Sequence, residues 1–80
     1  MNGPGGGKAS AVDVAFEGRV TIFSLADGRR VFTPLERFPF LVAASEEERN
    51  NWRIVDNGTR VVWPDIGQEI SLSDLMGPDQ

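Results

Sequence analysis

The chain has 80 residues and a net charge of −4, and it contains neither cysteine nor histidine. This composition excludes disulfides and nearly every zinc or iron site, and it leaves no histidine to activate a serine nucleophile. The hydrophobic core of so short a chain is thin, and self-association is a common way to supplement it. We therefore expect a homodimer.

The charge is distributed unevenly along the chain. Residues 1–40 carry five basic and four acidic side chains, whereas residues 41–80 carry three basic and eight acidic ones. An acidic surface repels phosphate, so we expect no direct nucleic-acid binding and, if anything, a basic protein partner. No signal-peptide pattern and no apolar run of roughly 20 residues is present, so we expect a cytoplasmic protein that does not enter a membrane.

The first half of the chain predicts a flexible tail and a three-stranded meander. Residues 1–10 hold four glycines and little to bury, so we predict a flexible tail over 1–10 and one domain over 11–80. Apolar residues alternate at Val12, Val14 and Phe16, which is typical of a half-buried strand. Strands over residues 20–25 and 30–33 follow, joined by Asp27-Gly28, a strong hairpin signal.

The second half predicts short helices around a second hairpin. Pro39 interrupts the helical spacing of residues 34–44, and Ser45 with Glu48 forms a capping-box pattern that predicts a helix over 46–52. Asn57-Gly58 predicts a type I′ turn between strands 53–55 and 60–63. Ile70 suggests a further short strand, and a last helical turn follows it. The fold class is α+β: an antiparallel β meander plus a second β-hairpin with short helices, in a single compact domain.

Few side chains are candidates for a functional site. Asp65 and Glu69 could pair as acid and base or hold a divalent metal, although more metal ligands at closer spacing would be expected. The run Glu46–Glu48 fits a helix cap on a solvated face, or alternatively a docking surface. We predict that Trp63 lies in the core or at a dimer seam rather than on a ligand platform. The candidate residues for an interaction surface are Trp63, Pro64, Asp65, Glu47 and Arg37.

Four stretches of the chain resemble a bacterial family known as domain of unknown function 2442. These stretches are Asp27-Gly28-Arg29, then Pro34-Leu35 with Phe38-Pro39, then Ser45 to Asn50, and finally Val61-Val62-Trp63-Pro64 with Ile70-Ser71. The resemblance implies a small α+β domain, found alone or ahead of a helix-turn-helix domain, and often encoded beside a second small gene in toxin–antitoxin-like pairs. It implies no enzymatic activity and no cofactor.

Three functions follow from these observations. The first is a non-enzymatic protein-interaction module, the antitoxin-like or accessory partner of a second small protein. The second is a self-associating structural domain, a homodimer with no foreign partner. The third is a small enzyme or metal protein.

Overall fold

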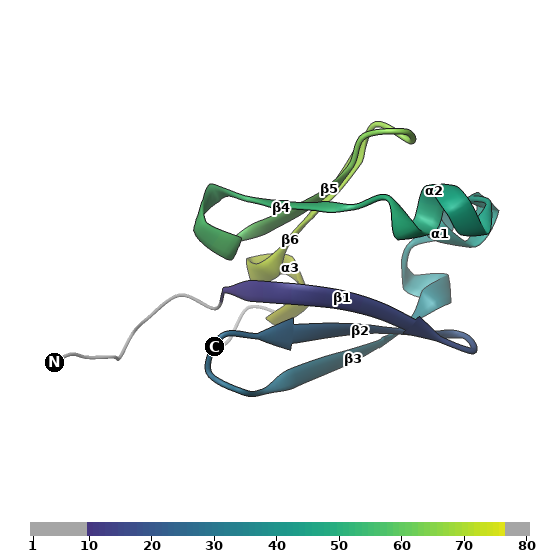
Figure 1. The fold of residues 1–80 in the computed structure, drawn as a ribbon. Coiled ribbons are helices and arrows are strands. Elements are labelled where there is room, and N and C mark those ends of the chain that lie inside the picture. Colours follow the sequence, from purple (N-terminus) through teal and green to yellow (C-terminus); the bar gives the residue numbers. More distant parts are fainter. Residues whose placement is uncertain (1–9, 77–80) are drawn as a thin grey trace, which may run out of the picture.

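The computed structural model describes residues 10–76. Two three-stranded antiparallel sheets lie one above the other, with short helices at their ends (Figure 1). Sheet A has the strand order β1-β2-β3 and sheet B the order β4-β5-β6. The elements are β1 (Ala11–Glu17), β2 (Val20–Leu25), β3 (Arg30–Pro34), α1 (Pro39–Ala43), α2 (Glu46–Asn50), β4 (Arg53–Val55), β5 (Arg60–Trp63), β6 (Gln68–Ser71) and α3 (Leu72–Met76). The predicted α+β class and the meander are confirmed.

The inner faces of both sheets form one hydrophobic core. Phe23 and Leu25 from β2 meet Val61 and Trp63 from β5, and the helices α1 and α3 add Leu41, Leu72 and Leu75. Alternation along β5 places Val61 and Trp63 inward together, as predicted. Because one core unites both sheets, residues 11–75 form a single packing unit.

The start of β1 differs from the predicted alternation. The pairing register between β1 and β2 shifts by one residue between Ala11 and Asp13, which is a β-bulge. The bulge turns Val12 outward, with 57% of its surface exposed, and buries Ala11 in its place. Most of the predicted tail, residues 1–9, lies outside the described residues. Ser10, which was assigned to that tail, belongs to the fold, because its carbonyl accepts a 2.8 Å hydrogen bond from the backbone of Ala26.

The hairpin between β4 and β5 and its turn at Asn57-Gly58 are confirmed, because both residues have positive φ and the Thr59 backbone N–H donates a 3.1 Å bond to the Asp56 carbonyl. Val55 pairs with Arg60, so the loop has four residues, 56–59. Asp56, Asn57 and Gly58 all have positive φ, and a Cβ on Gly58 would lie 2.9 Å from the Cβ of Ser10. The loop is therefore shaped by its close packing against the start of β1.

Helix α2 has the predicted capping box and is shorter than expected. The Ser45 hydroxyl accepts a 3.1 Å bond from the Glu48 backbone, and the Glu48 carboxylate accepts a 3.0 Å bond from the backbone of Ser45. The helix ends at Asn50 rather than at Trp52, because Trp52 packs against the core instead. None of the helices within residues 10–76 is long and apolar enough to cross a membrane.

Candidate functional site

The residues proposed from sequence as an interaction surface are not all at the surface. Trp63 has no exposed surface, and its indole Nε1 donates a 2.9 Å hydrogen bond to the carbonyl of Arg49. It belongs to the core, as predicted, and leaves nothing for a second chain to contact. Trp63 is therefore removed from the candidate surface, and a dimer seam at this ring is excluded.

The other four candidates are exposed but engage different parts of the chain. Arg37 donates a 3.2 Å hydrogen bond to the backbone carbonyl of Asp74 in α3. Asp65 accepts a 2.8 Å bond from Asn51, while Pro64 and Glu47 are exposed near the end of β5 and on α2. These contacts fasten neighbouring segments to each other. Nothing in the geometry gathers the four residues into one binding site.

The carboxylates considered for acid–base or metal chemistry are also held separately. The carboxylate of Glu69 accepts bonds of 3.0 and 2.9 Å from Arg60, and Arg60 also donates a 2.6 Å bond to Asp56. Hydrogen bonding, first to Asp56 and then to Glu69, holds the pKa of Arg60 above its usual value. Asp65 has its own partner in Asn51. Within residues 10–76, no group of three metal-binding side chains comes together.

The outer faces of the two sheets differ in character. On sheet B the outward residues include the ion pairs of Arg60, so this face is polar and solvated. On sheet A the register places Ala15, Ile22 and Phe32 side by side across all three strands. Ile22, in the middle of this row, is only 8% exposed and lies outside the cluster that the inner faces of the two sheets form. We call these three residues the outer apolar row.

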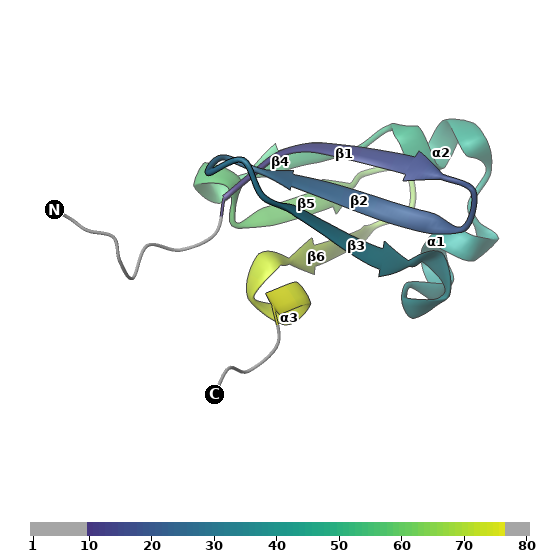
Figure 2. The ribbon, with the colours of Figure 1, turned by 90° about the horizontal axis from the view of Figure 1, so that it is seen from below.

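Phe32 is the exposed end of the outer apolar row. Its side chain is 62% exposed, the largest exposed fraction among the big apolar residues described. In Figure 2 the three strands of sheet A are seen from below, and no other described element lies over their outer face. A phenylalanine so placed on an uncovered sheet is the type of feature that marks a contact surface.

Strand β3 also has an unpaired edge. Leu25 donates a 2.8 Å backbone bond to Arg29, and Leu35 donates one to Arg19 at the other end of the β2–β3 ladder. Hydrogen-bonded pairs recur at every second residue of an antiparallel ladder, so Val31 and Thr33 are the residues of β3 that bond to β2. The backbone groups of Arg30 and Phe32 therefore point away from β2, where the described residues supply no further strand.

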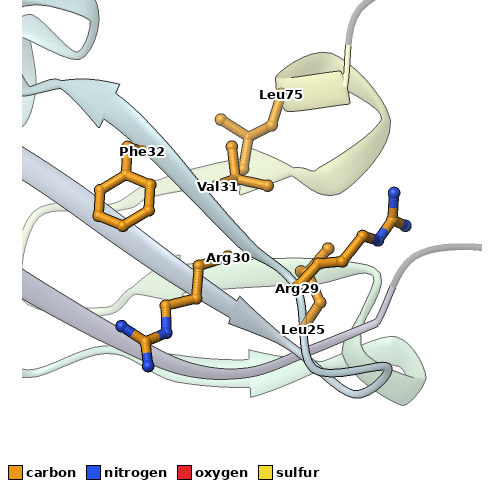
Figure 3. A pocket seen from close by; sticks show the side chains of 6 residues that line it. All are labelled: Leu25, Arg29, Arg30, Val31, Phe32 and Leu75. Atoms are coloured by element: carbon orange, nitrogen blue, oxygen red, sulfur yellow. The ribbon is translucent and has the colours of Figure 1, made fainter.

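An open depression of about 410 Å³ runs along this edge. Its lining residues are Leu25, Arg29, Arg30, Val31, Phe32 and Leu75. Val31 and Leu75 point toward each other, whereas Arg30 and Phe32 point to the opposite side of β3 (Figure 3). The edge thus offers backbone hydrogen-bonding groups with an apolar contact on each side.

Sequence reasoning missed this surface, although part of the signal was present. Alternation predicts that Arg30, Phe32 and Pro34 share one face of the third strand. The sequence does not show that this face is left uncovered, because the position of the second sheet depends on contacts distant in the chain.

The comparisons with known proteins identify a family but no function. The family model described as "Protein of unknown function (DUF2442)" matches residues 11–80. No curated protein and no solved structure matches the chain.

Proposed function

Because the chain belongs to the DUF2442 family, whose description states no activity, we propose a function from the surface alone. The chain is a non-enzymatic protein-interaction module, the accessory or antitoxin-like partner of a second small protein in the cytoplasm. It binds an extended segment of that protein through the β3 edge. The observation that carries this proposal is the unpaired edge of β3 beside the exposed Phe32.

Strand addition suits the geometry of this edge. A segment alongside β3 accepts and donates backbone bonds at Arg30 and Phe32, which supplies affinity independent of sequence. Its side chains alternate between the outer apolar row and the depression lined by Val31 and Leu75, which supplies specificity. Aromatic residues at such positions commonly dominate binding energy.

Charge favours a partner of mixed sign. The net charge of −4 attracts a basic protein at long range and raises its association rate. At the edge itself Arg29 and Arg30 are exposed, and Arg30 forms no ion pair among the described residues. An acidic side chain in the bound segment would pair with it.

The proposal is tested in three steps. The chain is co-purified from the native cells, the bound polypeptide is identified, and the complex is reconstituted from purified components. Phe32→Lys should weaken the reconstituted complex at least about tenfold, which corresponds to about 1.4 kcal/mol. Val42→Lys is the matched control, because Val42 is also an exposed apolar residue, at 43%, but lies on α1. A reconstituted complex that tolerates Phe32→Lys as well as Val42→Lys would refute the proposed site.

The alternative is a homodimer without a foreign partner. The same β3 edge favours it, because an antiparallel pair of identical strands satisfies the same backbone groups. A native preparation that contains only this chain, with no second polypeptide bound, would support the alternative.

A further inference from the structure

We propose that β3 pairs antiparallel with β3 of a second copy of this chain, around a two-fold axis that passes beside Phe32. This inference rests on the proposed function, because it uses the same β3 edge and names what occupies that edge when no foreign segment is bound. The pairing joins two copies of sheet A into one six-stranded sheet.

The backbone allows only a few registers for this pairing. With Phe32 opposite Phe32 of the second copy, the two phenylalanines exchange two hydrogen bonds. Each Arg30 then lies opposite Pro34 of the other copy and donates one bond to its carbonyl, so four bonds form in total. Moving the strands two residues toward Pro34 would lose bonds, because proline has no N–H to donate.

Charge decides between the two registers that keep four bonds. The other one places the axis at Val31, which brings Arg30 opposite Phe32 and makes the two copies of Arg30 diagonal neighbours, about 7–8 Å apart. With the axis at Phe32, the two arginines are separated by four residues along the strands, about 13 Å, which exceeds the screening length of about 8 Å at physiological salt.

The preferred register also places opposite charges near each other. Glu36 follows Pro34 by two residues, in the 3-10 turn Leu35–Arg37 that follows β3, and its exposed carboxylate forms a 3.3 Å ion pair with Arg19 of the same copy. Arg30, which forms no ion pair among the described residues, lies opposite Pro34 of the second copy and therefore close to the segment that carries Glu36 of that copy. The two-fold axis places the second Arg30 in the same way near the other copy of Glu36.

Side chains on the outer face give this register its apolar contact. The outer apolar row of one copy continues directly into that of the other, with the two Phe32 rings adjacent at the centre. Cross-strand aromatic pairs of this kind stabilise antiparallel sheets. On the inner side, Val31 of one copy lies opposite Thr33 of the other.

The dimer and the foreign complex compete for the same backbone groups. Arg30 and Phe32 can bond either to the second copy or to a foreign segment, because each strand has only one free edge. Binding of a foreign segment at β3 therefore dissociates the dimer, and the resulting complex contains one copy of this chain.

Sedimentation equilibrium of the full chain tests the association. The wild-type protein should have twice the 8.8 kDa mass of the single chain at tens of micromolar, and so should Val42→Lys. Phe32→Lys should have the single-chain mass with an unchanged circular dichroism spectrum, because Phe32 contributes little to the core. A monomeric wild type, or a dimeric Phe32→Lys, would overturn the inference.

A single engineered thiol tests the register. The chain contains no cysteine, so Phe32→Cys introduces one thiol per copy, and a hydrogen-bonded pair separates the two Cα atoms by about 5.5 Å, within the range that disulfides span. Mild oxidation should cross-link Phe32→Cys, and Val42→Cys should remain uncross-linked. A dimer in which Phe32→Cys cross-links no faster than Val42→Cys would overturn the register.

These outcomes are separate from failure of the proposed function. A monomeric wild type that still binds a foreign polypeptide through Phe32 would overturn the dimer and leave the proposed function intact. A wild-type chain that is dimeric, whose Phe32→Cys variant cross-links, and whose uncross-linked form captures no foreign polypeptide would support the inference and contradict the proposed function.

Discussion

Replacing Trp63 tests how the core holds the two sheets and the helices together. Trp63 is the largest fully buried side chain, its ring packs edge-on against Phe40 at 5.7 Å, and its Nε1 donates to the carbonyl of Arg49. It therefore links β5 to both α1 and α2. Trp63→Ala should cost about 3–5 kcal/mol. At about 0.05–0.15 kcal/mol per residue, the whole domain has roughly 4–12 kcal/mol of stability, so this variant should lose between about a quarter and all of it.

Trp63→Phe is the more informative variant, because it keeps most of the apolar volume and removes the N–H. The Arg49 carbonyl then loses its partner, which costs about 1–3 kcal/mol and lowers the melting temperature by at least about 4 °C. Trp52→Phe is the matched control, because Trp52 is only half-buried, so its replacement should lower the free energy of unfolding by less. Urea unfolding followed by circular dichroism measures both. A Trp63→Phe variant within about 0.5 kcal/mol of the wild type would refute this account.

Three further changes have defined outcomes. Thr21→Val should raise the free energy of unfolding by about 1 kcal/mol in urea titrations, because the buried Thr21 hydroxyl has no hydrogen-bond partner in the described structure; a loss of stability would contradict this. Gly58→Ala should lower the melting temperature more than Gly28→Ala, because both have positive φ but only at Gly58 would a Cβ collide with neighbouring atoms; equal effects would argue against that collision. The hydrogen bond from the backbone N–H of Arg29 holds the pKa of the Asp27 carboxyl below its usual value of 3.8. The ionised carboxylate therefore stabilises the fold above that pH, and this contribution is lost as the pH falls through the lowered pKa. An NMR titration should find this low pKa, and Asp27→Asn should remove the corresponding part of the acid-induced loss of stability.

Local signals in the sequence were sufficient for most of the elements. The alternation at Val14 and Phe16, the Asp27-Gly28 turn and the capping box at Ser45 each depend on neighbouring residues, and each is present in the structure. Errors arose where a distant contact competes with a local preference. Val12 was predicted to share a face with Val14, yet a bulge at the start of β1, where Gly58 packs against Ala11, turns Val12 outward.

The candidate site was harder to predict for the same reason. Size and aromaticity singled out Trp63, but whether a ring is buried depends on which strands and helices surround it, and the sequence does not show this. Phe32 carried no local signal that distinguished it from Phe23, since both lie in predicted strands. The difference between them is that Phe23 faces sheet B, whereas Phe32 faces the side of sheet A that no described element covers.

The ends of β3 explain how an exposed edge can pair once without pairing repeatedly. Open edges risk unlimited strand addition, and charged residues and proline are common safeguards against it. Arg30 and Pro34 stand at the two ends of β3, with Phe32 between them. In the two-fold pairing each arginine meets the proline of the other copy, so both safeguards are accommodated and the interface closes on itself. Moving the axis to Val31 brings the two copies of Arg30 close together. Moving the strands the other way places Pro34 where an N–H donor is needed, so hydrogen bonds are lost. The residues that protect the edge against general aggregation are therefore the same ones that select a single register for the dimer.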